Sequence, residues 1–109
     1  MAYKYFPREE LKCKGASCCG GSYPMQGAFM DRMQILREFV GVLNVNSAYR
    51  CEVHNEVVGG AKGSYHKQGL AMDVWSPTVP LAEVALTAQK LGLYTIVYKT
   101  FVHVDGRGL

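Results

Sequence analysis

The sequence predicts a single α+β domain over residues 1–109, with a largely antiparallel sheet flanked by helices. Two segments carry apolar residues at helical spacing, and several shorter segments alternate between apolar and polar residues as strands do. These helices and strands do not alternate regularly along the chain, which favours an antiparallel sheet. The length of 109 residues is that of one domain.

The first third of the chain is expected to hold a short lead, a loop and one long helix. Residues 1–12 form a short N-terminal segment. Within it, residues 7–11 are expected to make one helical turn that starts at a proline, a residue that is tolerated at the first helical position. Residues 13–27 are rich in glycine and predict a loop. A helix is predicted over residues 28–40, and Gly41 ends it in the left-handed conformation.

The middle third is expected to hold two strands joined by a short helix and a loop. Residues 42–49 alternate approximately and predict a strand. Residues 51–58 predict a short helix that ends at two glycines, and residues 61–69 predict a loop. A second strand is predicted over residues 70–75, where alternation places Asp73 on the face opposite the core residues.

The last third predicts a helix and two short strands. Apolar residues fall on one face of a helix over residues 81–91, and Gly92 caps it. Residues 94–98 and 101–105 predict strands that are joined by a tight connection.

Composition narrows the classes of partner. Apolar residues make up 49% of the chain and charged residues 19%, which is ordinary for a globular protein and wrong for a disordered one. The net charge of +3 is mild, and no basic run is interleaved with aromatic residues, so nucleic acid is not an expected partner. No apolar run approaches the roughly 18 residues that suggest a membrane span, so no membrane insertion is expected. We expect a monomer.

Two histidines and an aspartate form a candidate metal site. His66 and Asp73 lie seven positions apart with a glycine between them. On the last predicted strand, His103 and Asp105 face away from the core, as Asp73 does on its own strand. If these strands are neighbours, His66, Asp73 and His103 converge as in zinc sites with three protein ligands and one open position. Zinc in such a site lowers the pKa of a bound water toward about 7 and makes it a nucleophile.

Five stretches of the chain carry a family resemblance. They are residues 5–13, 47–55, 58–61, 64–73 and 101–105. Together they resemble the M15 family of zinc D-Ala-D-Ala peptidases, above all its small forms from bacteriophages and bacteria, over nearly the whole chain. The most specific part is a His-x6-Asp and a His-x-Asp motif after a Ser-x-Tyr-Arg lead.

The resemblance implies a fold, a cofactor and a reaction. The fold is the hedgehog-like α+β fold of D-Ala-D-Ala peptidases, and Zn²⁺ is held by the residues that match His66, Asp73 and His103. The reaction is hydrolysis of peptide bonds at D-alanine in peptidoglycan stem peptides or cross-links, by a carboxypeptidase or an endopeptidase. Such an enzyme is a phage lysin or a wall-remodelling enzyme.

Two further residues are candidates for substrate binding. Arg50 matches an arginine that the family places near the substrate, and a guanidinium fits a carboxylate such as that of a terminal D-Ala. A surface salt bridge is the alternative for Arg50. Ser64 either donates a hydrogen bond to substrate or shapes the loop.

The general base departs from the family pattern. Many relatives carry a carboxylate three residues before the last histidine, where this chain has Thr100, and threonine cannot serve as a base. Asp105 is the substitute, either as the base that takes a proton from the water or as a residue that orients a ligand imidazole. If neither holds, the chain is a catalytically inactive zinc module that binds cell wall or protein.

The start of the chain bears on where the protein acts. It lacks the apolar segment of an export signal, so we expect synthesis in the cytoplasm without a signal peptide. The protein then reaches the cell wall only after it is released from the cytoplasm, through a partner that opens the membrane.

A second constellation has the ligand types and short spacings of a structural zinc site. It consists of Cys13, Cys18, Cys51 and His54. Free buried thiols and a disulfide between the first and last of these cysteines are alternatives, and free thiols are favoured because the spacing is loose. The state of Cys19 stays equally open. On this hypothesis of a cysteine-bound zinc, the protein is a small domain that is stabilised by that ion and binds nucleic acid. His66, Asp73 and His103 then have no metal-binding role.

Overall fold

The computed structural model describes residues 3–15 and 18–109 and confirms the α+β architecture. Residues 1–2 of the expected lead and residues 16–17 of the expected loop lie outside the described residues. The elements in chain order are α1 (Arg8–Leu11), α2 (Gly27–Val40), β1 (Asn44–Ser47), α3 (Glu52–Val57), the 3₁₀ helix η1 (Tyr65–Gln68), β2 (Ala71–Trp75), α4 (Leu81–Lys90), β3 (Tyr94–Val97) and β4 (Val102–Asp105).

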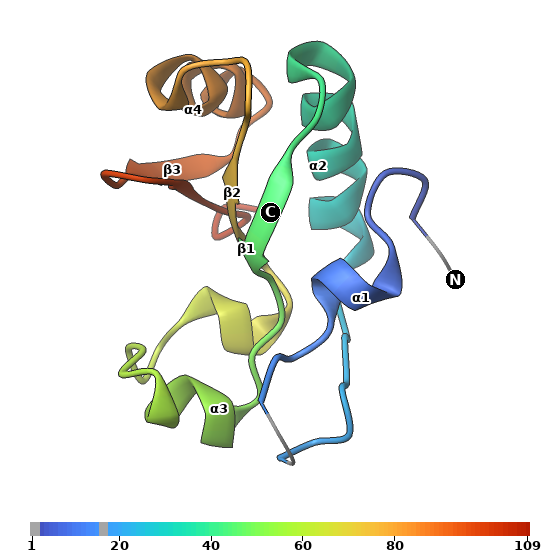
Figure 1. Ribbon diagram of the computed structural model, residues 1–109, viewed down its shortest axis with the longest axis vertical. Helices are drawn as coiled ribbons and strands as arrows, with labels where there is room; N and C mark the ends of the chain where they lie inside the picture. Colours follow the sequence, from blue (N-terminus) through green and yellow to red (C-terminus); the bar gives the residue numbers. More distant parts are fainter. Residues whose placement is uncertain (1–2, 16–17) are drawn as a thin grey trace.

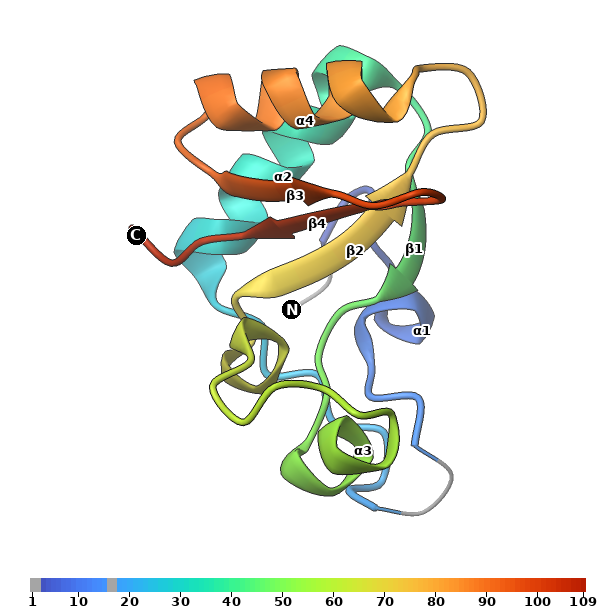
Figure 2. The same cartoon turned by 90° about the vertical axis from the view of Figure 1, so that its left-hand side faces the viewer.

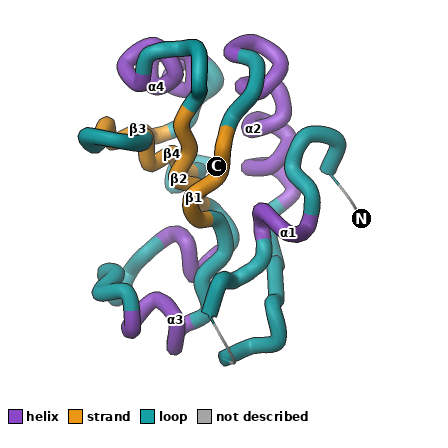
Figure 3. The backbone as a smooth tube through the Cα atoms, viewed as in Figure 1, coloured by secondary structure: helices purple, strands orange, loops and turns teal. Residues whose placement is uncertain are grey.

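The strands form one antiparallel sheet in the order β1-β2-β4-β3 (Figure 3). β2 and β4 are therefore central, and their register pairs Asp73 with His103 and Val74 with Val102. Because side chains alternate along a strand, this register puts the valines on one face and the aspartate and histidine on the other. The neighbouring strands that the metal hypothesis requires are thus present.

The upper part of the molecule in Figure 1 consists of α2, α4 and the four strands, and we call it the sheet lobe. Figure 2 shows α2 behind the strands and α4 above them. Apolar side chains from both helices pack against one face of the sheet, because each helix carries its buried residues on one stripe. The fully buried residues include Phe29, Met33, Leu36, Met72, Val74, Val84, Val102 and Val104.

The lower part in Figure 1 holds little regular structure, and we call it the loop lobe (residues 12–15, 18–24 and 49–69). It contains α3 and η1, joined by a glycine-rich turn. The buried side chains of its described residues are Cys13, Cys51, Asn55 and His66. This lobe therefore has no apolar core of its own.

Several predicted boundaries shift. The first strand was expected over residues 42–49 but spans only Asn44–Ser47, and its pairing with β2 is irregular between Val45 and Ser47. The expected loop over residues 61–69 contains η1, a single turn that carries no apolar period by which it could be predicted. Among the described residues, no helix has the length and apolarity needed to cross a membrane.

Candidate metal centre

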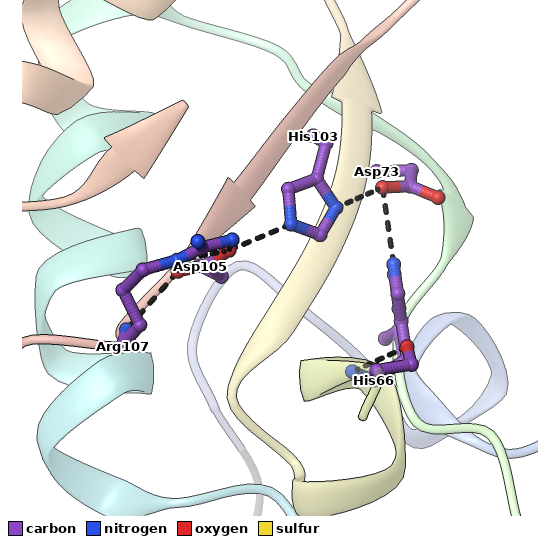
Figure 4. A network of polar contacts seen from close by, with 7 residues as sticks. His66, Asp73, His103, Asp105 and Arg107 are labelled. Carbon is purple, nitrogen blue, oxygen red and sulfur yellow. Dashed lines mark hydrogen bonds and ion pairs between the residues drawn. The ribbon is translucent and has the colours of Figure 1, made fainter. Parts of the chain in front are cut away.

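Three side chains from three elements meet on the face of the sheet that is turned away from the core (Figure 4). His66 comes from η1, Asp73 from β2 and His103 from β4. Oδ1 of Asp73 lies 3.1 Å from Nε2 of His66 and 3.0 Å from Nδ1 of His103. The structure thus brings together all three predicted metal ligands, and their ligand atoms lie within 4.8 Å of one another.

The turn that carries His66 is shaped by its two flanking residues. The Ser64 hydroxyl accepts a hydrogen bond from the backbone N–H of His66 and so caps η1. Gly69 ends the turn in the left-handed conformation with φ 70°, where a Cβ would also collide with the Pro24 carbonyl. The sequence Ser-x-His followed by glycine therefore fixes the approach of the imidazole to the sheet.

Both imidazoles are held from behind by hydrogen-bond acceptors. Nδ1 of His66 lies 2.7 Å from the carbonyl oxygen of Ala48. Nε2 of His103 lies 2.8 Å from Oδ2 of Asp105. When each of these nitrogens carries the ring proton, the other nitrogen presents its lone pair toward Oδ1 of Asp73.

This arrangement leaves a place for a cation. A neutral imidazole has one N–H, yet both nitrogens of each ring face acceptors: a carbonyl or carboxylate behind and Asp73 in front. The two front contacts require either a second proton on each ring or a metal ion between the lone pairs and the carboxylate. Two nitrogens and one oxygen are a donor set that zinc accepts, and the hydrogen bonds behind the rings are those that orient metal-ligating histidines.

The charges of the centre are strongly coupled. Burial alone would raise the pKa of Asp73, but hydrogen bonds from His103 and His66 outweigh it and bring the pKa to about 2. Burial would lower the pKa of His103, but the two carboxylates that it contacts raise it overall. Asp73 is therefore an anion at neutral pH and an available oxygen ligand.

Asp105 lies behind the centre and is fully buried. Besides His103 it contacts Arg107, whose Nη2 donates to Oδ2 at 2.7 Å and whose Nε donates to Oδ1 at 2.9 Å. Burial would raise the pKa of Asp105, but these hydrogen bonds lower it overall. Arg107 was missed in the sequence, although an arginine two residues after an aspartate on a predicted strand was a visible signal.

A cleft of about 500 Å³ opens over the three ligands. The other side chains that line it include Arg50, Ser64, Tyr65, Tyr98, Phe101 and Arg107. Both predicted substrate-binding residues therefore face the same space as the ligands. Thr100 is exposed in the turn before β4 and is not among the lining residues.

Arg50 is a cation without an anionic partner among the described residues. Its Nε is buried and has no hydrogen-bond acceptor within the part of the chain that is described. Burial lowers its pKa, although the negative charge of Asp73 acts in the opposite direction. A half-buried guanidinium that lines a cleft and lacks an internal partner is available to an anionic group of a ligand.

The family model of peptidase M15 matches residues 4–105, which is almost the whole chain. The chain belongs to the peptidase M15 family. The resemblance seen in the sequence is thereby confirmed, and no curated protein matches the chain in addition. The family consists of zinc metallopeptidases, so membership supports hydrolysis of a peptide bond by this M15 chain, and the donor set of the centre fits the ion.

Proposed function

We propose that this M15 chain is a zinc-dependent peptidase that hydrolyses bonds at D-alanine in peptidoglycan stem peptides or cross-links. One observation carries the proposal: two imidazole lone pairs and the Asp73 carboxylate converge in a cleft that also contains the unpaired Arg50. Family membership supports peptide-bond cleavage, and the cleft supports a substrate with an anionic group.

The metal-binding role falls to three residues. His66 Nε2, His103 Nδ1 and a carboxylate oxygen of Asp73 would hold Zn²⁺. Zinc, when bound, polarises a carbonyl oxygen and makes water acidic enough to attack near neutral pH. Ala48 and Asp105 keep the ring protons on the outer nitrogens, so the inner nitrogens stay free for the ion.

Arg50 and Ser64 would position the substrate. A stem peptide that ends in D-alanine offers a carboxylate, which a guanidinium binds through two parallel hydrogen bonds. The Ser64 hydroxyl already accepts the His66 N–H and lines the cleft, so it can shape the turn and still donate its own proton to substrate.

Asp105 has two candidate roles, as the general base or as a positioning residue. Its contacts with His103 and Arg107 support the second role, because both carboxylate oxygens are already engaged. In that role it fixes the ring proton of His103 and makes the ligand nitrogen more basic.

The deciding experiment is a digest of purified peptidoglycan with mass analysis of the products. The zinc-loaded protein should release D-alanine or expose new amino groups, and a chelator should stop the reaction. His66→Ala should lose both the zinc of this centre and activity, because one of the three ligands is gone. His54→Ala is the matched control, since the remaining histidine lies in α3 outside the centre and its loss should leave activity unchanged.

A catalytically inactive zinc module is the second candidate, and Thr100 at the position of the usual carboxylate favours it. Zinc-dependent binding to peptidoglycan without any new product would establish this candidate and contradict the first. We further propose that the protein is a monomer that is made in the cytoplasm and reaches the wall after a partner opens the membrane.

A further inference from the structure

Four cysteine sulfurs meet in the loop lobe, away from the histidines. Cys13 follows α1, Cys18 and Cys19 lie in the glycine-rich loop, and Cys51 is the N-cap residue of α3. Cys18 Sγ lies 3.7 Å from Cys13 Sγ, 3.9 Å from Cys19 Sγ and 2.9 Å from Cys51 Sγ. Cys13 Sγ and Cys51 Sγ are 3.7 Å apart, and all four sulfurs lie within 4.8 Å of one another.

Three of the four sulfur–sulfur contacts have the separation of a tetrahedral thiolate site, and the fourth, between Cys18 and Cys51, is shorter at 2.9 Å. Four sulfurs at about 2.3 Å from one zinc ion lie about 3.8 Å from each other. Three of the four contact distances are 3.7, 3.7 and 3.9 Å. A disulfide would join sulfurs in pairs at about 2.05 Å, whereas here Cys18 contacts the other three and all four cysteines are free.

The backbone around the sulfurs is also arranged for this cluster. Cys51 Sγ accepts the backbone N–H of His54 at 3.5 Å, a contact that stabilises a thiolate. Gly15 passes so close to Cys18 Sγ that a Cβ at this position would collide with the sulfur. The loop can therefore close over the cluster only because residue 15 has no side chain.

The loop lobe needs a stabilising element of this kind. α3 buries no apolar side chain, and its Val53 and Val57 are 58% and 77% exposed. Cys13 and Cys51, by contrast, are 2% and 8% exposed. In the loop lobe, the buried interior thus contains cysteine sulfurs, whereas in the sheet lobe it contains apolar side chains. A bound metal ion contributes folding free energy to a structure that lacks an apolar core.

We propose that Cys13, Cys18, Cys19 and Cys51 bind one structural Zn²⁺, separate from the ion held by His66, Asp73 and His103. Each thiol gives up its proton and becomes a thiolate ligand, and no electron is transferred. Four protein ligands close the site to water, as in structural zinc sites. The ion ties Cys13, Cys18 and Cys19 to the start of α3, and therefore holds the adjacent Arg50 in the cleft.

The geometry revises the ligand set suggested by the sequence. The spacing hypothesis combined three cysteines with His54, but the fourth sulfur of the cluster is that of Cys19. His54 contributes its backbone N–H instead. Sequence spacing could not separate these candidates, because the loop conformation decides which side chain turns inward.

Metal analysis of single-site variants tests the proposal. Protein purified under reducing conditions with zinc should carry two zinc ions per chain, and His66→Ala should carry one. Cys18→Ser should also retain one ion, because the hub sulfur of the cluster is removed while the histidine centre remains. A wild-type content of one ion that Cys18→Ser does not reduce would overturn the proposal. So would iron in place of zinc.

Cobalt identifies the ligands of the remaining ion. In His66→Ala, only the cysteine site is left, and Co²⁺ bound there should show strong sulfur-to-cobalt charge-transfer absorption. The double variant His66→Ala/Cys18→Ser should lose that absorption. Cobalt binding to His66→Ala without the sulfur band would refute thiolate ligation. The histidine centre is absent in both variants, so the result is independent of whether the chain is a peptidase.

Thiol labelling covers the case in which a cysteine variant does not fold. In the unmodified, zinc-loaded protein, the four thiols should resist an alkylating reagent and become labelled after a chelator is added. Intact mass reads the outcome. Rapid labelling before chelation, or a mass about 2 or 4 Da below that of the reduced chain because of disulfides, would contradict the proposal.

Discussion

The sheet lobe and the loop lobe reach a folded state by different chemistry. The sheet lobe buries Leu36, Met72, Val102 and similar residues between two helices and a sheet. The loop lobe buries sulfur, an amide and an imidazole, and leaves the valines of α3 exposed. Stability in the first lobe comes from apolar area, whereas in the second it comes from hydrogen bonds and, on our proposal, from metal.

The candidate centre lies where the two lobes meet. Asp73 and His103 stand on the rigid central strands of the sheet lobe. His66, Ser64 and Arg50 belong to the loop lobe. The sheet lobe therefore fixes the positions of Asp73 and His103 through strand pairing. The positions of the loop-lobe side chains depend instead on the contacts that stabilise the loops.

The largest contrast is expected from truncating one helix residue in each lobe. Leu36→Ala in α2 removes a fully buried side chain and should lower the free energy of unfolding by about 2–5 kcal/mol. Val57→Ala in α3, at a residue that is 77% exposed, should change it by less than about 0.5 kcal/mol. Urea denaturation of the zinc-loaded proteins measures both. Equal losses would show that α3 has an apolar anchor after all.

Removal of metal should affect the lobes unequally. A site that is half-saturated at one hundredth of the free zinc concentration adds about 2.7 kcal/mol to the state that binds it. Chelation should therefore speed amide exchange in α3 and η1 by about a hundredfold, with little change in β2 and β4. The same comparison of α3 in His66→Ala, with and without chelator, is the control, because that variant keeps the cysteine cluster but loses a ligand of the histidine centre. Equal acceleration in the central strands would contradict two separately stabilised lobes.

A substitution at Asp105 tests how the sheet lobe contributes to zinc binding. Asp105→Asn removes the anion that fixes the ring proton of His103, and the affinity of the centre for zinc should fall by about 10–100-fold. Excess zinc should then restore activity, measured as product released from peptidoglycan. Activity that stays low at saturating zinc would instead identify Asp105 as the base. The exposed Asp31 provides the matched control, and Asp31→Asn should change neither quantity.

Arg50 tests the loop-lobe side of the junction and should give the smallest effect. Arg50→Lys keeps the charge but loses the forked donor, so KM for a carboxylate-terminated peptide should rise by about tenfold with little change in kcat. Steady-state kinetics with that peptide and with its C-terminal amide separates the roles. The amide should show no difference between the two proteins. Arg37→Lys is the control, because Arg37 lies in α2 and does not line the cleft.

Periodic elements were predictable from the sequence, and so was much of the centre. Alternation in residues 70–75 and 101–105 placed Asp73 and His103 on the polar face of their strands, and the observed register joins them. The loop lobe was less predictable. η1, the contact of Arg107 with Asp105 and the inward turn of Cys19 depend on loop conformation, for which short sequences carry no period.

His66 holds the segment before α3 at two points. Its ring contacts the Ala48 carbonyl oxygen at 2.7 Å, and its own carbonyl oxygen accepts the backbone N–H of Arg50 at 3.2 Å. The residue that we propose as a metal ligand is thus joined by two hydrogen bonds to the segment that carries the residue that we propose to bind the substrate carboxylate. If Arg50 binds the terminal carboxylate of a peptide, these contacts help to fix its separation from the metal centre. That separation sets how many atoms lie between the cleaved bond and the chain end. On the proposed function, such a fixed separation would favour removal of a terminal residue over cutting within a longer strand.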